Sequence, residues 1–454
     1  MKCCRVILAS VLTLIVFAAV MSVPFRTAVA SNGDEIGQLV QRFRKETKCD
    51  RVSVVVFENG ESTFYGDRES LYQIGSMTKA FTGLAVQMLI LDGMVDADGD
   101  VADYIPGFEA YYDSEKVGIT VRDLLEQKSG YTNSEKDYPS ASAGMTLAAW
   151  ADSISGRELK SRPGEQYAYS NVNFNLLGLI AENVSGMSYR DYMEQEVLIP
   201  LGLENTFVGM PADGWIVEGA RLGYRHAFDF PVAVREASIP AGYFYSDTGD
   251  MARWIGIWTG SVSIPENLAR SLSAVKENLH TEGDYYAGWE LFAEGIVGHS
   301  GGTPNYSSRI VFDGEKQTGV CVLCNLNVAA TTDSLCNSIM DIVSDKTPAG
   351  LAGDIWTIFD RIFTGVTVCG ILLLLTAIRT KKKVLLIVLD VITAVLLALV
   401  LILFPIIFGA GMREIVFTWA PWSLAGGLLM MAVVVAAATV RLLISGPGEY
   451  KAVE

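Results

Sequence analysis

The chain has 454 residues, half of them hydrophobic, and a net charge of −16 at pH 7. Residues 31–349 hold 24 of the 35 basic and 45 of the 51 acidic residues, a net charge of −21. This charge argues against a nucleic-acid partner, because such a domain repels phosphate backbones. The segment is long enough to bury a full core, either as one bilobed unit or as two subdomains.

The first 30 residues have the pattern of a secretory signal peptide. Two basic residues precede an apolar run over residues 6–20, and Ala28–Ala30 offers a small-residue cleavage site before Ser31. We expect residues 1–30 to be removed, so that the mature chain begins outside the cytoplasm. An uncleaved anchor helix is the alternative, because the apolar run is long for a signal peptide.

Residues 51–57 and 61–65 are rich in β-branched and aromatic side chains, and Asn59-Gly60 lies between the two runs. The pattern predicts a β-hairpin with a tight turn.

A Ser-x-x-Lys motif follows, with Ser76 and Lys79 at the start of an apolar segment over residues 80–91. The periodicity predicts a helix, and Gly75 allows a sharp turn before it, so both side chains should share one face of the first helical turn. A serine hydroxyl needs a nearby base to act as a nucleophile, and Lys79 can serve when its amine is deprotonated. This motif is common by chance, and Ser273–Lys276 repeats it in a polar stretch as an internal control.

Helical periodicity dominates the middle of the chain, and strand patterns return afterwards. Helices are predicted at 119–128, 146–155, 172–185, 189–198 and 331–344, and strands at 285–293, 295–298, 306–312 and 318–325. Strands at both ends with helices between them predict that the two ends share one sheet and that the middle forms a helical lobe. A cleft between the lobes is the expected place for a site.

Tyr169 is a second candidate base. It follows a Pro-Gly turn at 163–164, and Asn171 begins the apolar helix after it. A phenolate near Lys79 could take the serine proton and return it to the leaving group. Tyr131 and Asn133 repeat the Tyr-x-Asn spacing, but without the turn before and the helix after.

The third motif is His299-Ser300-Gly301-Gly302, which follows a strand-like run. Its two glycines would let a substrate backbone lie against the strand edge. The chain has three histidines in all, so a metal-dependent mechanism would be hard to build, and no metal or cofactor is expected.

In this order, the motifs at Ser76, Tyr169 and His299 resemble the serine β-lactamase and penicillin-binding-protein superfamily. The branch is that of class C β-lactamases and peptidases of family S12. The resemblance extends over residues 51–344 and includes shared phrases at 124–130, 163–207 and 240–251. It implies an α+β, two-lobed domain at residues 31–345, with an antiparallel sheet flanked by helices and an all-helical lobe.

The resemblance also implies the roles of individual residues. Ser76 would be acylated, Lys79 and Tyr169 would transfer protons, and Asn171 would bind the amide of the substrate. The backbone N–H groups of Ser76 and Gly302 would form the oxyanion hole.

His299, Ser300 and Gly301 would bind the substrate along the strand, but His299 departs from the β-lactamase pattern. Many relatives have lysine there, in a Lys-Thr-Gly strand. Imidazole has a pKa of about 6.5 and is only partly cationic at neutral pH. We therefore expect weak recognition of a substrate carboxylate and poor turnover of penicillins and cephalosporins.

The implied function is that of an extracytoplasmic serine hydrolase anchored in the cell membrane. It would act through an acyl-enzyme on D-amino-acid-containing peptides, amides or esters, possible sources being peptidoglycan and teichoic acid. The alternative is a catalytically weak protein that binds β-lactams or wall fragments and has a scaffold or signalling role.

Five cysteines remain beyond the signal peptide: Cys49, Cys321, Cys324, Cys336 and Cys369. An exported domain permits disulfides, although the sequence does not fix their connectivity. Cys321 and Cys324 lie in an apolar, β-branched strand without a nearby histidine. This favours buried thiols, or one bridge to Cys49 or Cys336, over metal or redox chemistry.

Beyond a linker at 346–355, three apolar segments follow at 356–378, 384–408 and 419–444. Each is near the length of about 20 residues that crosses a bilayer.

The basic cluster Arg379–Lys383 predicts a cytoplasmic loop, which places the catalytic domain outside and the tail 445–454 inside. Trp419 and Trp422 would lie in the outer interfacial belt, and Arg441 would reach the inner interface. Asp390 lies within the second span, near its start, which favours an interfacial or helix-contact role.

Overall fold

The computed structural model describes residues 34–281, 284–292 and 295–444. The expected signal peptide and the tail lie outside the described residues. The chain forms two compact units. One, called the sheet unit below, comprises residues 34–220 and 229–352; the other, the helix unit, comprises Arg221–Phe228 together with the chain from Gly353 onward.

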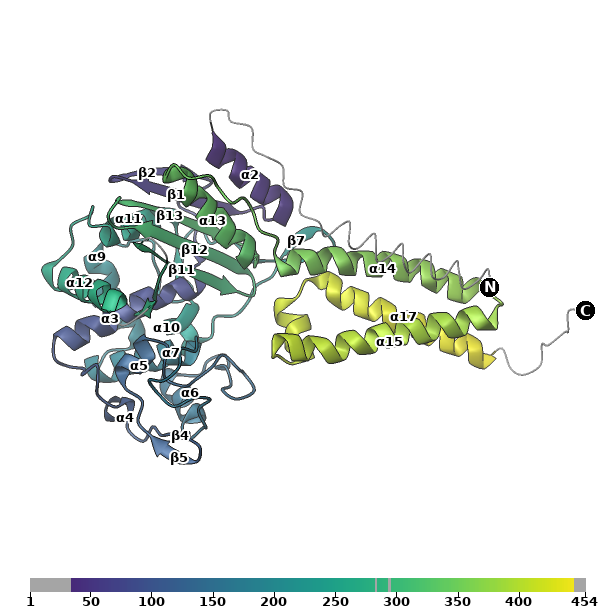
Figure 1. Cartoon of the computed structure of the whole chain (residues 1–454), viewed down its shortest axis with the longest axis horizontal. Helices are drawn as coiled ribbons and strands as arrows, with labels where there is room; N and C mark the ends of the chain where they lie inside the picture. Colours follow the sequence, from purple (N-terminus) through teal and green to yellow (C-terminus); the bar gives the residue numbers. More distant parts are fainter. Residues whose placement is uncertain (1–33, 282–283, 293–294, 445–454) are drawn as a thin grey trace, which may run out of the picture. The chain divides into compact units, whose positions relative to one another are not determined.

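A seven-stranded antiparallel sheet is the centre of the sheet unit (Figure 1). Its strands, in spatial order, are β2 (Glu61–Tyr65), β1 (Val52–Glu58), β13 (Thr318–Cys324), β12 (Tyr306–Asp313), β11 (Ile296–Thr303), β10 (Trp289–Leu291) and β9 (Tyr285–Tyr286). Val55 on β1 pairs with Cys321 on β13, so the two ends of the unit share one sheet, as predicted. The β1–β2 hairpin turns at Asn59 and Gly60, whose φ angles of 50° and 89° fit the predicted tight turn.

Helices cover both faces of this sheet. The helices of the unit are α2 (Glu35–Thr47), α3 (Lys79–Leu91), α4 (Val101–Tyr104), α5 (Val121–Leu125), α6 (Leu147–Ile154), α7 (Asn171–Ser185), α8 (Tyr189–Tyr192), α9 (Ile199–Leu201), α10 (Ile239–Gly242), α11 (Thr248–Trp258), α12 (Glu266–Thr281) and α13 (Ala329–Val343). Two-stranded pairs are β3 (Tyr72–Gln73) with β8 (Tyr245–Ser246), and β4 (Ala110–Tyr112) with β5 (Glu115–Val117). A short 3₁₀ turn, η1 (Gly75–Thr78), precedes α3, and a π-helical turn, η2 (Met193–Leu198), follows α8.

α13 packs on one face of the sheet and α11 on the other, while α4, α5, α6 and α7 form the helical lobe (Figure 1). One continuous hydrophobic core joins lobe and sheet, because α3 and α7 pack against each other in its centre. Both helices are apolar around most of their circumference, which is the pattern of a buried helix.

Three predicted elements differ from the structure. The helix predicted at 119–128 is only α5 (Val121–Leu125), because Gln127 adopts a left-handed φ of 59°. The strand predicted at 285–293 is divided into β9 and β10 by Ala287 and Gly288, which both have positive φ. The strand predicted at 295–298 continues as β11 to Thr303 and thus contains the whole His299 motif.

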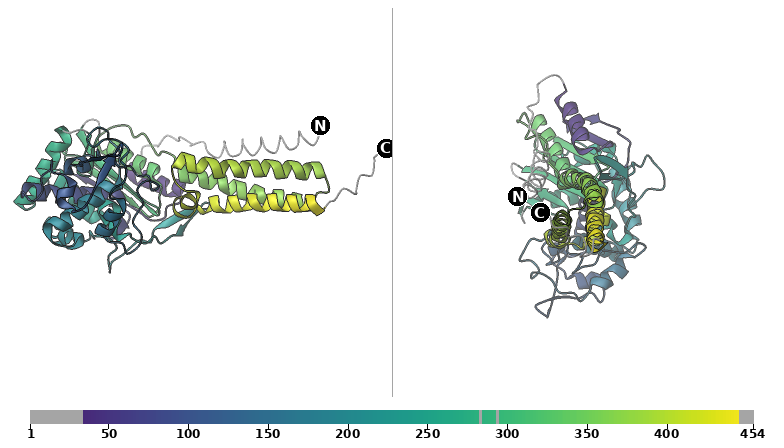
Figure 2. Two further views of the ribbon diagram at one scale, coloured as in Figure 1. Left: turned by 90° about the horizontal axis from the view of Figure 1, so that it is seen from below. Right: turned by 90° about the vertical axis from the view of Figure 1, so that its right-hand side faces the viewer.

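Among its described residues, the helix unit contains three helices long and apolar enough to cross a membrane. They are α14 (Ile355–Arg379), α15 (Lys383–Phe408) and α17 (Trp422–Ile444). A short α16 (Met412–Glu414) and a π-helical turn, η5 (Ile415–Trp419), connect the last two. α17 packs against both α14 and α15, and Figure 2 shows the bundle from its end.

Polar contacts join these helices. Asp390 on α15 accepts a hydrogen bond from Thr439 on α17 at 3.1 Å, which agrees with the predicted helix-contact role. Arg441 donates to the backbone oxygen of Thr380 at 3.0 Å, at the α14–α15 connection.

All five cysteines of the described chain are free thiols in this structure. Cys49, Cys321, Cys324 and Cys336 are buried. This agrees with the prediction of buried thiols rather than with the alternative of a bridge to Cys49 or Cys336.

Candidate active site

Ser76 and Lys79 lie at the junction of η1 and α3. Lys79 Nζ and Ser76 Oγ lie 3.0 Å apart, within hydrogen-bond distance, so the Ser-x-x-Lys spacing brings the two side chains together. The sharp turn depends on Gly75, whose φ is +53°. A Cβ atom there would lie 2.6 Å from the backbone nitrogen of Gly302, so this glycine also lets β11 approach the serine.

Lys79 is fully buried, and its three hydrogen-bond partners are all uncharged. Besides Ser76, they are Asn171 Oδ1 at 2.7 Å and the backbone oxygen of Ala241 at 2.6 Å. Burial lowers the pKa of Lys79 well below its usual range. The desolvated amine therefore favours its neutral form, which a general base requires.

Neutral Lys79 fits the observed contacts. An uncharged amine has two N–H donors and one lone pair. Asn171 Oδ1 and the Ala241 carbonyl only accept, so they take the two donors. The lone pair is then left to face the hydroxyl of Ser76.

Tyr169 reaches the same serine from the loop before α7. Its phenol is a hydrogen-bond partner of the Ser76 side chain, and its ring centroid lies 5.0 Å from Lys79 Nζ. Burial raises the pKa of Tyr169, so the phenol is protonated at neutral pH. This favours Lys79 over a Tyr169 phenolate as the group that deprotonates Ser76.

Gln127 holds the loop that carries Tyr169. Its backbone oxygen accepts from the Ala168 N–H at 2.8 Å, and its Oε1 accepts from the Ser170 N–H at 2.9 Å. The same Oε1 also accepts from the side-chain amide of Asn173 on α7. Gln127 is fully buried, so these bonds fix the residues on both sides of Tyr169.

Asn171 is the first residue of α7 and is exposed beside Lys79. Its own backbone N–H donates to Asn133 Oδ1 at 2.8 Å, and Ser170 caps the helix by accepting from the Val172 N–H. The two contacts set where α7 begins, and hence where the Asn171 amide lies.

β11 passes along the serine turn. A Cβ atom on Gly301 would lie 2.1 Å from the backbone oxygen of Ile74, so only glycine permits this approach. Gly302 is exposed, and its backbone nitrogen lies against Gly75, next to Ser76. The structure thus brings the expected second oxyanion donor to the nucleophile.

His299 is 2% exposed and neutral. Its Nδ1 lies 2.6 Å from the backbone oxygen of Ser300, which can only accept, so Nδ1 carries the proton. Burial lowers the pKa of His299 to about 3. Its ring packs beside those of Tyr169 and Tyr285, at centroid distances of 6.0 and 5.9 Å. The imidazole therefore supplies no positive charge for a substrate carboxylate.

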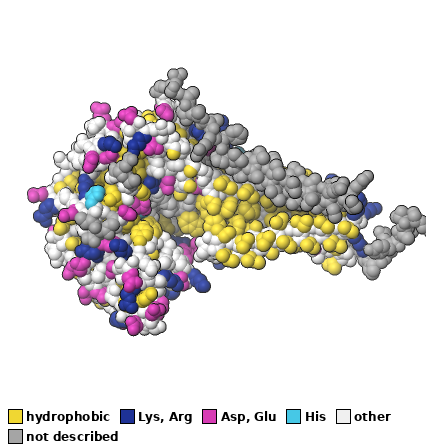
Figure 3. Space-filling view, in the orientation of Figure 1, with side chains coloured by type: hydrophobic (Ala, Val, Ile, Leu, Met, Phe, Trp, Pro, Cys, Tyr) yellow, Lys and Arg dark blue, Asp and Glu magenta, His cyan; other side chains and the backbone are white. Residues whose placement is uncertain are grey.

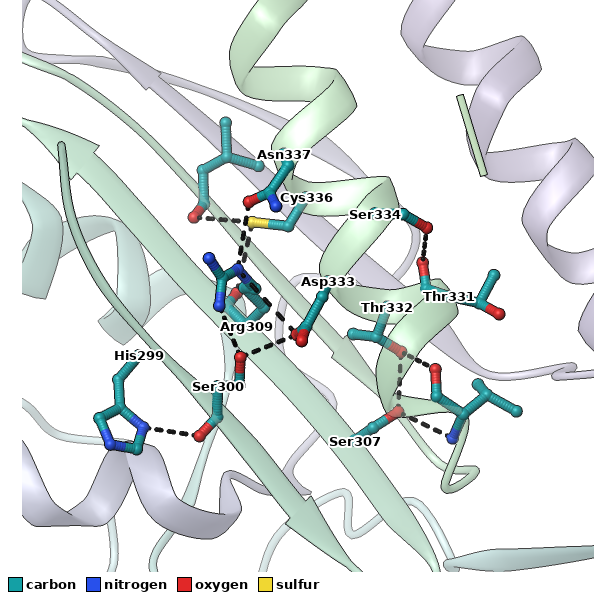
Figure 4. Close-up of polar contacts among 12 residues, drawn as sticks. His299, Ser300, Ser307, Arg309, Thr331, Thr332, Asp333, Ser334, Cys336 and Asn337 are labelled. Carbon is teal, nitrogen blue, oxygen red and sulfur yellow. Dashed lines mark hydrogen bonds and ion pairs between the residues drawn. The ribbon is translucent and has the colours of Figure 1, made fainter. Parts of the chain in front are cut away.

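The Ser300 side chain points to the face of the sheet opposite the His299 side chain, as the alternation of side chains along a strand requires (Figure 4). Its hydroxyl donates to Asp333 Oδ1 at 2.9 Å and accepts from Arg309 Nη1 at 2.6 Å. Arg309 also donates to Asn337 on α13 at 3.1 Å. The side chain of Ser300 anchors β11 to α13, which leaves the backbone of Ser300 as the part available to a substrate.

The two chance matches differ from the site. Ser273 is exposed and donates to the backbone oxygen of Ala269, while Lys276 lies over the ring of Trp258 at 5.9 Å. Tyr131 is fully buried and packs edge-on against Tyr138. Neither match has the contacts that join Ser76, Lys79 and Tyr169.

The Beta-lactamase family profile matches residues 36–342, well over half of the chain. The chain belongs to this family. Protein flp of Staphylococcus aureus (strain NCTC 8325 / PS 47) is 29% identical over 381 residues, covering 77% of this chain and 75% of that protein. A putative D-alanyl-D-alanine carboxypeptidase of Escherichia coli (strain K12) is 35% identical over 150 residues, covering 30% of this chain and 33% of that protein.

Solved structures confirm the β-lactamase-like fold. The octameric penicillin-binding protein homologue from Pyrococcus abyssi has a TM-score of 0.59 at 21% identity, covering 72% of this chain and 80% of that one. Class C β-lactamases match with a TM-score of 0.56. The β-lactamase family that the three motifs resembled is therefore confirmed.

Sequence reasoning missed three contributors to the site: Gln127, Asn133 and Ala241. Gln127 and Ala241 lie in phrases shared with the family, at 124–130 and 240–251, but no chemical pattern marks them. A backbone carbonyl such as that of Ala241 can belong to any residue type. Asn133 belongs to the second match to the Tyr-x-Asn spacing, which was set aside in favour of the match at Tyr169.

Proposed function

We propose that this protein is a serine hydrolase that forms an acyl-enzyme on Ser76 and acts on D-amino-acid-containing peptides, amides or esters. The observation that supports it most is the buried Lys79 amine, 3.0 Å from the Ser76 hydroxyl and bonded only to uncharged acceptors. Such an amine is a competent base at neutral pH. Similarity to the putative D-alanyl-D-alanine carboxypeptidase of Escherichia coli supports the substrate class.

The proposed acylation starts with transfer of the Ser76 proton to Lys79 as Oγ attacks the substrate carbonyl carbon. The N–H groups of Ser76 and Gly302 stabilise the oxyanion. The protonated phenol of Tyr169 donates to the leaving nitrogen or oxygen, and the proton held by Lys79 restores the phenol. Water then attacks the ester, and the same groups act in reverse to release a carboxylic acid.

The neutral His299 bears on substrate choice. A lysine at this position, as in class C β-lactamases, would bind a free substrate carboxylate through its ammonium group, whereas the buried imidazole of His299 adds no charge. We therefore propose a preference for esters and amides without that carboxylate over penicillins and cephalosporins. Fragments of peptidoglycan or teichoic acid are the proposed natural source.

The proposed location is the outer face of the cell membrane, with α14, α15 and α17 as anchors. Their length and hydropathy support membrane insertion. The outward orientation is proposed from the basic cluster Arg379–Lys383 and the signal-like N-terminus.

Mass spectrometry of the purified full chain tests the activity. After exposure to a fluorophosphonate, to D-alanyl esters and peptides, and to penicillin, we expect an adduct on Ser76 and release of product from the D-alanyl substrates. Ser76→Ala should abolish both, and Ser273→Ala should change neither. Unchanged labelling of Ser76→Ala would refute the nucleophile.

The alternative is a catalytically weak binder of β-lactams or wall fragments. It predicts a stable adduct without release of product in the same experiment. The intact group of Ser76, Lys79 and Tyr169 favours hydrolysis, because a binder has no use for all three.

A further inference from the structure

The two N–H groups of the expected oxyanion hole come from separate segments of the chain. Ser76 lies in the η1 turn, and Gly302 lies on β11. β10 pairs with β11 only at Val297 and Gly298, so among the described strands the part of β11 that holds Gly302 pairs with β12 alone. An open strand edge lets a substrate reach the backbone, but it lacks ladder bonds on that side. Other contacts must therefore fix the distance between the two donors.

Ser308 on β12 holds the serine turn. Its Oγ donates to the backbone oxygen of Ile74 at 2.8 Å, and Ile74 directly precedes the turn Gly75–Thr78. Ser308 is 1% exposed, so water does not compete for this hydrogen bond. A Cβ atom on Gly301 would lie 2.1 Å from both the Ile74 oxygen and Ser308 Oγ. The turn, β11 and β12 therefore meet at this hydrogen bond.

The next residue of β12, Arg309, holds β11 from the opposite face of the sheet. Arg309 is directly opposite Ser300 in the register of the two strands. Its Nη1 donates to Ser300 Oγ at 2.6 Å, and Ser300 Oγ donates to Asp333 Oδ1 on α13 at 2.9 Å (Figure 4). Ser300 is two residues before Gly302, so the backbone N–H groups of both point to the same edge of β11.

Charge and burial make this contact rigid. The side chains of Arg309 and Asp333 are 9% and 34% exposed, and Arg309 Nε lies 4.0 Å from Asp333 Oδ1. The same Nε donates to Asn337 Oδ1 at 3.1 Å, and the guanidinium lies over the ring of Phe292 at 5.0 Å. A connected polar network of this kind has one favourable geometry, whereas apolar side chains between strand and helix would permit several.

We propose that Ser308 and the Arg309–Asp333 pair are positioning residues that set the separation between the N–H groups of Ser76 and Gly302. Ser308 and Arg309 are adjacent on β12 and point to opposite faces, so one short segment of strand holds both donors. The inference rests on the proposed hydrolase function and deepens it. Oxyanion donors act at about 2.7–3.1 Å, so a small displacement weakens binding of the transition state more than binding of the substrate.

Steady-state kinetics of the full chain in detergent test the proposal, with a chromogenic D-alanyl ester as substrate. Ser308→Ala and Asp333→Ala should each lower kcat about tenfold and change KM less than about twofold. Ser300→Thr keeps the hydroxyl and Asp333→Asn keeps an acceptor oxygen, so both should retain kcat within about threefold. Ser334→Ala is the matched control: its hydroxyl bonds within α13 and to the segment after this helix, and neither constant should change.

Binding of phenylboronic acid gives a second measurement that does not need turnover. Ser76 Oγ forms a bond to boron while its proton passes to Lys79, which leaves a tetrahedral boronate with one oxygen in the oxyanion hole. By calorimetry, Ser308→Ala and Asp333→Ala should each bind this probe about tenfold more weakly than the wild type. Ser334→Ala should bind it as the wild type does.

Unchanged kcat and boronate affinity in both Ala variants would overturn the proposal, as would a rise in KM alone. A lower melting temperature with wild-type kinetics would show a purely structural role and also overturn it. Ser308→Ala removes only a hydroxyl, so the test does not depend on folding of Asp333→Ala, which leaves a buried guanidinium without its carboxylate. A wild type that binds boronate without turnover would refute the hydrolase, and the boronate affinities of the variants would still decide this proposal. A wild type that shows neither would overturn both.

Discussion

At the scale of single residues, the protonation state of Lys79 controls the proposed chemistry. Because burial lowers its pKa, the amine is neutral above that lowered value and becomes protonated below it. Acylation should therefore be constant near neutral pH and fall as the pH drops through the lowered pKa. The raised pKa of Tyr169 keeps its phenol protonated until strongly alkaline pH.

Removing either group tests this assignment. Lys79→Ala and Tyr169→Phe should each slow acylation of Ser76 about a hundredfold or more, and the double variant should lose less than the sum of the two. Stopped-flow rates with a chromogenic ester measure the effect. Full activity in one single variant would remove that residue from the mechanism.

The burial of His299 leads to a second prediction at this scale, which concerns how the free energy of unfolding depends on pH. Its pKa is about 3 in the folded chain and about 6.5 when unfolded. Between these values only the unfolded state binds the proton, so the free energy of unfolding falls as the pH drops from 6.5 towards 3. The loss is at most about 1.4 kcal/mol per pH unit.

In His299→Asn the melting temperature should therefore decrease less between pH 7 and pH 4 than in the wild type. The exposed His280→Asn is the control and should follow the wild type. Scanning calorimetry across this range compares the slopes, so a general destabilisation by either substitution does not confuse the result. Equal slopes in His299→Asn and wild type would contradict the buried neutral imidazole.

At the scale of elements, the left-handed Gln127 ends α5 and holds the Tyr169 loop. Gln127→Ala leaves the Ser170 N–H and the Asn173 amide without their buried acceptor, at a cost of about 1–3 kcal/mol. We expect a melting temperature lower by a few degrees and acylation slower by about tenfold or more, because Tyr169 is displaced. Lys128→Ala is the control: it changes the next residue, whose side chain is partly exposed, and it should change acylation little.

The elements also show what the sequence could predict. Ser76 and Lys79 are three residues apart, so helical geometry alone brings them together. The sequence predicted that the two ends of the domain share one sheet, because strand patterns occur at both ends with helices between them; the pairing of β1 with β13 is how the structure achieves this. Gln127 was placed inside a helix, because periodicity does not show a left-handed residue.

The features that the sequence could not predict depend on contacts between residues far apart in the chain. The Ala241 carbonyl reaches Lys79 across 162 residues, and a carbonyl has no residue-type preference that a motif could record. Strand alternation would have placed Ser300 opposite His299. The burial of His299 depends on the packing of Tyr169 and Tyr285, which the sequence does not display.

At the scale of the whole chain, charge and hydropathy divide along the same boundary as the two units. Acidic side chains lie on the sheet unit, whereas hydrophobic side chains cover the surface of the bundle (Figure 3). Exposure of the Leu, Ile and Val side chains along α15 to water would be unfavourable, whereas contact with lipid chains would be favourable. The predicted spans agree with the observed helices to within one residue at each end, except that the third begins at Trp422, three residues later than predicted.

The last prediction concerns topology. The basic cluster Arg379–Lys383 should stay inside, so external protease on intact cells should reach the sheet unit but not an epitope at Glu454. Cleavage should occur in the exposed residues 345–349, because Gly350 and Ala352 are hydrogen-bonded to Ser338 and Ser334 of α13.

Cleavage there should not by itself release the sheet unit, since Arg221–Phe228 groups with the membrane helices. The cut should appear on a denaturing gel, with the larger fragment still sedimenting with membranes. In Arg221→Ala, which removes the guanidinium contacts to Val416, Phe417 and Ala420, more of the cut fragment should appear in the supernatant. A C-terminal epitope degraded from outside would contradict the three-span orientation, whatever the fate of the fragment.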